Sequence, residues 1–420
     1  MRIEADKLLL LIIFMLIVVG LVSVYSSTSV ISPDIIEKGS LKGKPASPFV
    51  FLKKQLITVL IGIFVMFLAY KIQIEHLKKL TFPLLVLSLI CLILVFTSLG
   101  VSAGGARRWI KAWPSVFQPS EIVKLSMVLF MAWYMSTNYF KTDKFISFVI
   151  PLTIMAIFQV IFIKQPDFGA VMSLGILTLT MLFIGGTKLK YLALIAVASL
   201  PIIAKLAFEP YRLKRITTFL NPWDDPLGSG FQLVQSFIAL GSGGIIGVGL
   251  GEGRQKLSYL PEIHTDFIFS LIGEEMGFIG ACFVVTLFSL LFIKGILIAK
   301  KTNDSFSSYL AYGITFMFAF QALINFAVVT GMVPTKGLPL PFISYGGSSL
   351  LVNMIAGGIL LNISRQNNKR MRQDSRIYNP FSNSTISTPQ KPIESDRVSH
   401  IRNNRFKTVY TFNRNNNTLF

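Results

Sequence analysis

Cysteine and histidine are scarce in this chain, which has two cysteines and three histidines among its 420 residues. Both cysteines, Cys91 and Cys282, lie inside long apolar runs, where a thiol acts as a small packing residue. A disulfide framework or a zinc site needs several cysteines or histidines at short spacings. The composition therefore excludes a disulfide-stapled domain, and we predict no dedicated metal site.

Charged residues are also few, at 14% of the chain, and the 20 acids are outnumbered by 40 lysines and arginines. In a soluble protein the resulting net charge of +20 would suggest nucleic-acid binding. However, a chain that is 52% hydrophobic, with a mean hydropathy of +0.62, has too little polar surface for a soluble domain. We attribute the excess positive charge to the loops and tail of a membrane protein, and expect no nucleic-acid partner.

The apolar residues occur in long blocks without the two-residue alternation of a β-barrel. A membrane-spanning helix needs roughly 20 mostly apolar residues. The blocks predict an all-α, polytopic membrane protein with about ten transmembrane helices, the first of them retained rather than cleaved as a signal peptide. The predicted helices lie near residues 8–27, 50–70, 81–99, 119–137, 145–163, 168–186, 190–208, 266–293, 306–331 and 342–363.

Two parts of the chain stand apart from these helices. A large loop near 209–265 separates the seventh and eighth helices, and we expect it outside the cytoplasm. Residues 365–420 are polar, basic and rich in asparagine, a composition typical of a disordered tail. We therefore predict a transmembrane domain at 1–364 and a disordered cytoplasmic tail at 365–420.

Lysines mark alternate loops, and such loops usually face the cytoplasm. This pattern places both termini in the cytoplasm and brings four unusual segments to the outer face. These are "GGARRWIKAWPSVFQPSE", "KQPDFG", the long loop ending in "LPEIHTD", and "PTKGLPLPFISYGGSS". They carry many basic residues against the orientation rule, so we expect an anionic ligand on that face.

The stretch "YLPEIHTDFIFSLIGEEMG" places Asp266 at the start of the predicted eighth helix. Asp266, Ser270, Gly273 and Gly277 fall within roughly 60° of one another on a helix, a stripe that lets another helix approach closely. Asp266 could serve chemistry or could simply satisfy the helix N-terminus, and both interpretations stay open. Glu275 points the opposite way, which favours a role in interhelical packing.

The stretch "FQPSEIVKL" places Pro119 and Glu121 in the first turn of the fourth helix, where both are favourable. Lys124 lies three residues further on the same face, about one turn into the membrane. An ammonium at that depth needs a carboxylate partner, and Glu121 is within reach. The pair could be functional or purely structural.

Three further segments carry candidate residues or motifs. Asp167 in "KQPDFG" lies just outside the sixth helix, where Pro166 favours a turn or a helix start. The basic run with Arg212 and Arg215 could be a solvated face or could hold lipid phosphate. The glycine-rich "GSGGIIGVGLGEG" lacks the Gly-Lys-Ser/Thr ending of a phosphate-binding loop, so we expect its glycines to allow tight turns and close backbone approach.

Taken together, these segments resemble the SEDS family (shape, elongation, division and sporulation proteins). The most specific matches are "NPWDDPLGSGFQLVQSFIALGSGGIIGVGLGEGRQKLSYLPEIHTDFIFSLIGEEMGFIG" and "PTKGLPLPFISYGGSS", and the resemblance covers about residues 8–364. Within these matches, "NPWDDP", "GEGRQKLSYLPE" and "PTKGLPLPFISYGGSS" are closer to the division branch than to the elongation branch.

The resemblance implies a bacterial inner-membrane enzyme that polymerises lipid II into peptidoglycan glycan strands on the outer face, at the division septum. It also implies a class B penicillin-binding protein as transpeptidase partner within the divisome. By motif match, Asp266, Glu121 and Lys124 take the family's catalytic and functional positions. We add as candidate substrate-binding residues Arg212, Arg215, Lys336, His264, Gln165 and Asp167.

Lipid II carries a pyrophosphate, so its polymerisation needs a base for the acceptor hydroxyl and positive charge at the leaving group. Asp266 has a suitable depth for the base. Lys124, Arg212, Arg215 and Lys336 are candidates for the positive charge, with or without a divalent cation such as Mg²⁺ or Mn²⁺. The alternatives are a lipid II transporter, a non-catalytic divisome scaffold, and the same polymerase acting in elongation. A transporter should show a charged site at the bilayer midplane and internal repeats, which the sequence lacks.

Overall fold

The computed structural model describes residues 6–28, 49–103, 106–112, 115–137, 139–140, 144–255 and 264–378. One compact unit spans Met1–Gln373, and a second spans Asp374–Phe420. Of the predicted disordered tail, residues 379–420 fall outside the described residues, so their state stays a prediction. The helix that precedes it continues beyond the predicted boundary at 364, to Tyr378.

Each of the ten predicted blocks forms a helix, so the all-α prediction is confirmed. Seven of the described helices are long and apolar enough to cross a membrane, α7 and part of α8 are shorter apolar helices, and α5 has 17 residues. The ten helices are α1 (Lys7–Thr28), α3 (Phe49–Lys71), α4 (Ile74–Leu94), α5 (Pro119–Met135), α6 (Ile146–Lys164), α7 (Phe168–Ile184), α8 (Leu189–Ala207), α11 (Ile268–Lys300), α12 (Ser305–Val329) and α13 (Gly347–Tyr378).

Some helix ends differ from the prediction. Helix α4 begins at Ile74, seven residues before the predicted start, because its first polar turn still buries Ile74 and Leu77 against the other helices. Helix α13 begins at Gly347 rather than 342, since residues 341–345 form turns. Hydropathy marks the segment in the hydrocarbon, whereas the hydrogen-bonded helix extends beyond it or stops short of it.

A small antiparallel sheet occupies the segment predicted as a loop at 100–118. Its strands are β1 (Gly100–Ala103), β2 (Ala106–Ala112) and β3 (Ser115–Phe117), in the order β1-β2-β3. Gly100 pairs with Ile110, which in turn pairs with Phe117. Strands this short leave little alternation in the sequence, so the prediction missed them.

The predicted outer loop at 209–265 is also structured where it is described. It contains α9 (Pro210–Leu220), the 3₁₀ turn η1 (Pro222–Asp224) and α10 (Phe231–Gly243). Helix α9 combines a basic face with exposed Leu213 and Leu220, as an interfacial helix does. Helix α10 packs on α11.

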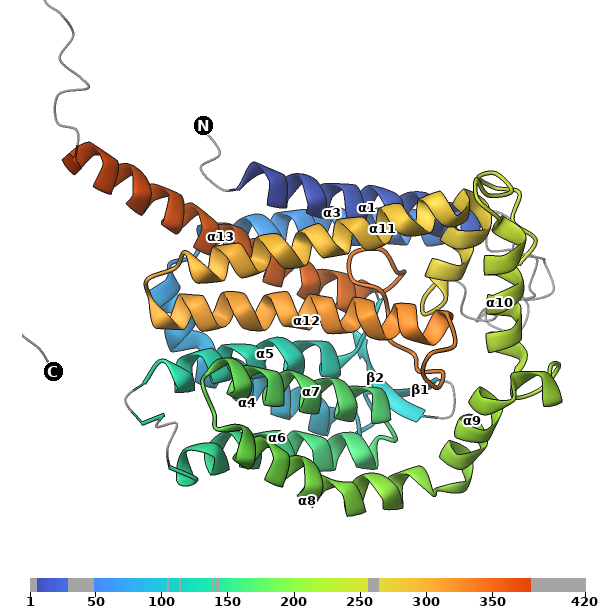
Figure 1. Cartoon of the computed structure of the whole chain (residues 1–420), viewed down its shortest axis with the longest axis horizontal. Helices are drawn as coiled ribbons and strands as arrows, with labels where there is room; N and C mark the ends of the chain where they lie inside the picture. The colour runs from blue at the N-terminus through green and yellow to red at the C-terminus, as the bar shows by residue number, and fades with distance from the viewer. Residues whose placement is uncertain are drawn as a thin grey trace, which may run out of the picture. The chain divides into compact units, whose positions relative to one another are not determined.

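Helices α5 and α12 lie at the centre of the described arrangement. Helix α12 packs on α11, α5 and α7, α4 packs on α5, and α1 packs on α3 and α11 (Figure 1). The outward faces of α3, α4 and α6 expose large apolar side chains, including Phe64 at 62% and Val86 at 54%. Such exposed apolar faces are stable in lipid rather than in water, so the chain is a multi-helix membrane protein.

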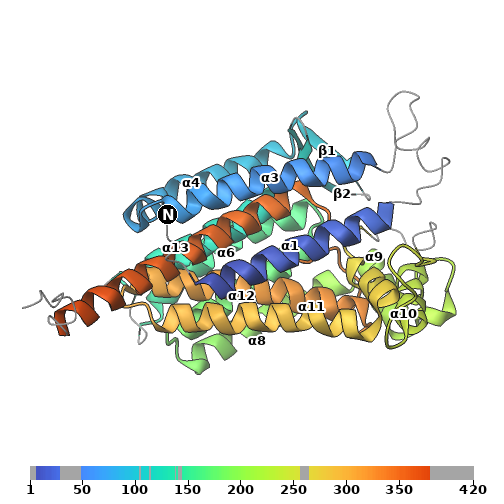
Figure 2. The same ribbon diagram turned by 90° about the horizontal axis from the view of Figure 1, so that it is seen from above.

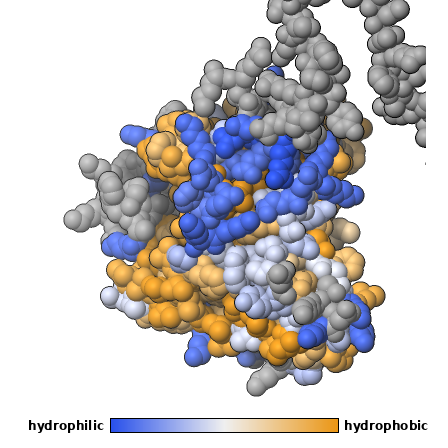
Figure 3. All heavy atoms as spheres, turned by 90° about the vertical axis from the view of Figure 1, so that its left-hand side faces the viewer, coloured by the Kyte–Doolittle hydropathy of each residue, from blue (hydrophilic) through white to orange (hydrophobic). Residues whose placement is uncertain are grey.

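The two ends of the helices differ in character. Strands β1 and β2 and helices α9 and α10 gather at one end, which is the right-hand end in both views (Figures 1 and 2). Seen from the opposite end, hydrophilic residues cover much of the upper part of the face and hydrophobic residues the lower part (Figure 3). Exposed residues near this end include Glu75, Lys79, Lys300, Lys301 and Lys369.

Candidate functional site

Asp266 lies two residues before α11, in a segment that is fixed to the loop between α12 and α13. The Asn325 amide of α12 donates to the carbonyl oxygens of Asp266 (2.7 Å) and Leu338 (2.8 Å). The Ser344 hydroxyl donates to the Thr265 carbonyl at 2.6 Å. These bonds hold residues 264–266 and 338–344 together, although the two segments are distant in the sequence.

The carboxylate of Asp266 lies directly over Gly337. A Cβ atom added at Gly337 would be 2.6 Å from Asp266 Oδ2, so the absence of a side chain there makes room for the acid. The next residue toward α12 is Lys336, whose Nζ lies 4.8 Å from the centroid of the Phe168 ring. Burial lowers the pKa of Lys336, because it penalises the charged ammonium. Asp266 thus lies beside the residue that follows Lys336, one of the predicted cations.

His264 is the second predicted site residue in this segment. Its ring packs against Tyr345 and Phe51, with centroids 5.6 Å and 5.8 Å away. Its carbonyl accepts from the Tyr345 backbone N–H at 2.9 Å. Burial raises the pKa of the Tyr345 phenol, which stays neutral at physiological pH. His264 therefore supports the segment that carries Asp266.

Glu121 and Lys124 form the predicted ion pair on α5. Lys124 Nζ donates to Glu121 Oε1 at 2.8 Å, and the two residues are only 3% and 2% exposed. The start of α5 is tied to the start of α13, since the Ser348 hydroxyl accepts from the Gln118 N–H at 3.1 Å. The segment 338–348 thus contacts both the Asp266 region and the first turn of α5.

The remaining predicted residues have diverse surroundings. Arg215 is exposed on α9 and donates to the Thr335 carbonyl at 3.1 Å, which brings it to the loop that carries Lys336. Arg212 lies on the same helix, but its side chain falls outside the described residues. Gln165 is buried and donates to the Leu92 carbonyl at 3.0 Å, a contact that joins the ends of α6 and α4.

Asp167 is the N-cap of α7, as the helix-start interpretation predicted. Its side chain accepts from the Ala170 N–H at 3.1 Å. Arg108 of β2 adds a guanidinium 3.9 Å from Asp167 and donates to the Pro166 carbonyl. Arg108 was not singled out among the basic residues of the outer segments, because the sheet that positions it was not predicted.

The small-residue stripe on α11 is confirmed in part. Gly243 of α10 packs against the Gly273 carbonyl, and Ser270 lies 2.7 Å from Ser236. The stripe does not continue to Gly277, because Gly277 has a φ of 65° and interrupts the helix. At that kink, the Glu275 carboxylate accepts from the Ser26 hydroxyl of α1 at 2.5 Å, which confirms its predicted packing role.

The glycine-rich segment after α10 pairs with this kink. The backbone N–H groups of Val248 and Gly249 donate to the carbonyls of Glu274 (3.0 Å) and Glu275 (3.1 Å). Gly247 and Gly249 have φ values of 92° and 108°, which non-glycine residues rarely adopt. Close backbone approach, rather than phosphate binding, is the role that these contacts indicate for the glycines.

Asn325 is the site residue that the sequence analysis missed. It holds both backbone segments next to Asp266, yet it lies within the apolar helix α12. A polar side chain in a membrane helix is itself a signal of function, and it was available in the sequence.

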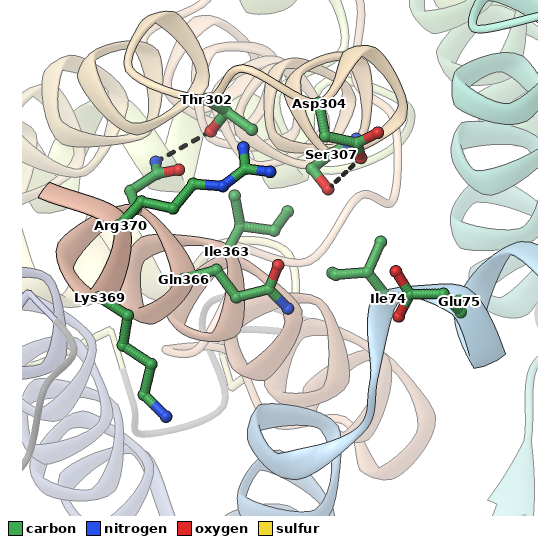
Figure 4. Close-up of a pocket in the computed structure, with 10 residues that line it drawn as sticks. Ile74, Glu75, Thr302, Asp304, Ser307, Ile363, Gln366, Lys369 and Arg370 are labelled. Carbon is green, nitrogen blue, oxygen red and sulfur yellow. Dashed lines mark hydrogen bonds between the residues drawn. The ribbon is translucent and has the colours of Figure 1, made fainter. Parts of the chain in front are cut away.

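Over the described ranges, no three His, Cys, Asp or Glu side chains lie close enough together to hold a metal ion. A polar pocket of ≈ 330 Å³ lies at the far ends of α12 and α13 from Asp266 (Figure 4). It is lined by residues such as Glu75, Asp304 and Arg370, and no predicted site residue takes part in it.

The fold and site define a multi-helix membrane protein with an acid and basic residues at one membrane boundary. A family model for cell cycle proteins, named for FtsW, RodA and SpoVE, matches residues 6–369. The chain belongs to this family, so the predicted SEDS membership is confirmed.

Several curated relatives are similar over most of their length. A probable peptidoglycan glycosyltransferase FtsW from Geobacter sp. (strain M18) is 42% identical over 367 residues, covering 86% of this chain and 98% of the relative. A probable peptidoglycan glycosyltransferase FtsW from Legionella pneumophila is 38% identical, covering 86% and 91%. The stage V sporulation protein E of Bacillus subtilis (strain 168) is 39% identical, covering 86% and 97%.

Two solved structures are similar in fold. One comes from work on the coordination of polymerization and crosslinking by a peptidoglycan synthase complex. It has a TM-score of 0.69 and 27% identity, and the match covers 86% of this chain and 98% of that one. The other is the rod shape determining protein RodA of Thermus thermophilus, with a TM-score of 0.63, 24% identity and coverage of 86% and 97%. The predicted enzyme class, a peptidoglycan glycosyltransferase, is confirmed by the names of the curated relatives.

Proposed function

We propose that the protein polymerises lipid II into peptidoglycan glycan strands at the outer face of the bacterial inner membrane, during septal wall synthesis. The observation that carries this proposal is the position of Asp266. Its carboxylate lies at the membrane boundary over Gly337, which is the residue after Lys336. An acid beside cations at this depth suits a reaction on a membrane-anchored pyrophosphate.

In the proposed reaction, a hydroxyl oxygen of the acceptor sugar attacks the anomeric carbon of the donor sugar. The new glycosidic C–O bond forms as the bond from that carbon to the pyrophosphate oxygen breaks. Asp266 accepts the hydroxyl proton, and the polyprenyl pyrophosphate departs with the bonding electrons. Asn325 holds the Asp266 backbone and so orients the base.

Positive charge at the leaving group is assigned first to Lys336 and Arg215. Arg215 donates to Thr335, the residue before Lys336, so the two cations belong to one cluster. Lys124 is neutralised by Glu121 at 2.8 Å and lies deeper in the membrane. We therefore assign the Glu121–Lys124 pair to the shape and electrostatics of the site, while Arg212, Gln165, His264 and Asp167 remain candidates for substrate contacts.

The partner and location follow the same proposal. A class B penicillin-binding protein within the divisome would crosslink the strands, and both termini would lie in the cytoplasm. The similar structure from a peptidoglycan synthase complex that couples polymerization to crosslinking supports such a pairing. We also assign the activity to residues 1–364, so truncation after Arg376 should leave polymerisation intact.

The experiment that tests the proposal is polymerisation of labelled lipid II by the purified protein with its transpeptidase, which is blocked by a β-lactam. Glycan ladders on a gel would support the proposal, and titration of Mg²⁺ and Mn²⁺ against EDTA would settle the cation requirement. If a verified complex makes no ladder under any of these conditions, the result favours the transporter or the scaffold alternative. Co-purification with the division rather than the elongation transpeptidase would assign the branch.

A further inference from the structure

Gln321 on α12 is a buried amide that the proposed mechanism does not use. It is 2% exposed, and neither its nitrogen nor its oxygen has a hydrogen-bond partner among the described residues. Because both atoms lack a partner, exchanging the two ends of the amide would not satisfy it. Buried amides are almost always hydrogen-bonded, so this side chain requires an explanation.

The packing of α12 on α5 places Gln321 at the level of Glu121. The two helices are antiparallel, since α5 starts next to β3 whereas α12 ends near Asp266 (Figure 1). Gly313 of α12 packs against Val128 of α5. Measured from Gly313, Gln321 lies about 12 Å along the axis of α12. Measured from Val128, Glu121 lies about 10.5 Å along the axis of α5, and in the same direction.

Helix geometry places Glu121 and Lys124 on the face of α5 that contacts α12, and Gln321 to one side of that contact. Glu121 and Lys124 lie within roughly 40° of the Val128 direction on α5, so both face α12. Around the axis of α12, Gln321 is rotated by roughly 80° from Gly313, which contacts α5. Asn325 is rotated further in the same sense, so Gln321 lies between the two. The Glu121 Oε2 atom likewise has no hydrogen-bond partner in the described part of the chain.

A third such atom comes from α13. The contact between Ser348 and Gln118 sets α13 parallel to α5, and Asn353 then lies at the level of Val123. Asn353 is 1% exposed, and its Oδ1 atom has no partner among the residues described. Three helices thus carry unsatisfied polar atoms at nearby levels of the interior.

The chemistry of this layer selects the ligand. Lys124 already neutralises Glu121, so neither an anion nor a cation would gain a free opposite charge. The unsatisfied atoms include an amide N–H₂ donor and several oxygen acceptors, and a hydroxyl group can both donate and accept. We propose that Gln321 binds a hydroxyl group, from a water molecule or from a substrate sugar, and shares it with the free oxygen of Glu121. The sugar source rests on the proposed function, whereas the water source does not.

The test compares Gln321→Leu with Asn362→Leu. Asn362 is an equally buried amide whose nitrogen donates to the carbonyls of Ala69 and Ile72. Leucine at 321 removes polar atoms that have no partner in the chain, so the Tm in detergent should stay the same or rise. Leucine at 362 breaks satisfied bonds, so the Tm should fall. The polymerisation rate of Gln321→Leu should drop roughly tenfold, because the variant loses one hydrogen bond in the site.

The kinetics distinguish the two sources of the hydroxyl. A sugar hydroxyl predicts a raised KM for lipid II, whereas a bound water predicts a lowered kcat at unchanged KM. Polymerisation within twofold of wild type, or a Tm that falls as far as in Asn362→Leu, would overturn the inference.

If the wild type makes no glycan, the proposed function fails, and radiolytic footprinting still tests the water source. Met317 lies one turn from Gln321 and is 2% exposed. A bound water should promote its oxidation in the wild type but not in Gln321→Leu. Equal oxidation in both proteins would then reject the inference.

Discussion

The carboxylate of Asp266 occupies the space that a side chain at residue 337 would fill: a Cβ there would be 2.6 Å from Asp266 Oδ2. The two residues are 71 positions apart, and they meet because Asn325 and Ser344 fix their segments to each other. The position of the proposed base is thus set by the loop between α12 and α13.

Replacing Asp266 by asparagine should abolish glycan synthesis while the protein remains folded. The amide keeps the shape but cannot accept the hydroxyl proton, and loss of a general base lowers a rate by roughly 10²–10⁴. The measurement is the initial rate with labelled lipid II. Asp225→Asn is a matched control, because Asp225 is an exposed acid that accepts from the N–H and hydroxyl of Ser229. Near-normal synthesis by Asp266→Asn would refute the base assignment.

Gly337→Ala should lower activity with little change in stability. The nearest atom to the added methyl is the end of the Asp266 side chain, which can rotate away but then leaves its productive position. A misplaced base can lower the rate by roughly 10²-fold. Gly346→Ala is the control, since its nearest neighbour would be Ser349 Cβ at an ordinary 3.8 Å. Equal rates for both variants would show that the contact with Gly337 does not position the acid.

Breaking the Glu121–Lys124 pair should separate its structural from its functional role. Lys124→Met leaves a buried carboxylate unpaired, which should lower the free energy of unfolding by about 3–5 kcal/mol. The double variant Glu121→Gln/Lys124→Met removes both charges and should restore most of that stability. If the pair serves the reaction, the double variant stays inactive although its Tm recovers. Recovery of both activity and Tm would make the pair purely structural.

The polymerisation rate at alkaline pH should depend on the protonation of Lys336. Burial lowers its pKa below the ordinary 10.5, so the ammonium proposed to stabilise the leaving group is lost at a lower pH than for an exposed lysine. The rate should therefore decline on the alkaline side as Lys336 deprotonates. Lys336→Arg keeps its charge and should move this decline to higher pH. The pH–rate profiles of the two proteins provide the measurement, and identical alkaline limbs would exclude Lys336 as the titrating group.

The sequence by itself determined the membrane class, the ten helices and the buried Glu121–Lys124 pair. Apolar runs of about 20 residues and pairs spaced three apart are local signals, which survive without knowledge of the fold. Motif resemblance also identified the family, because long motifs such as the one that ends in Gly280 are specific.

Tertiary structure alone decided how the site is assembled. The contact of Asp266 with Gly337, the role of Asn325 and the layer around Gln321 all depend on helix register and on a loop that returns to α11. The strands β1–β3 and the kink at Gly277 likewise arise from pairing between segments rather than from local preference. Contacts between distant segments leave no periodic pattern in a single sequence, and for that reason the geometry of the site could not be read from it.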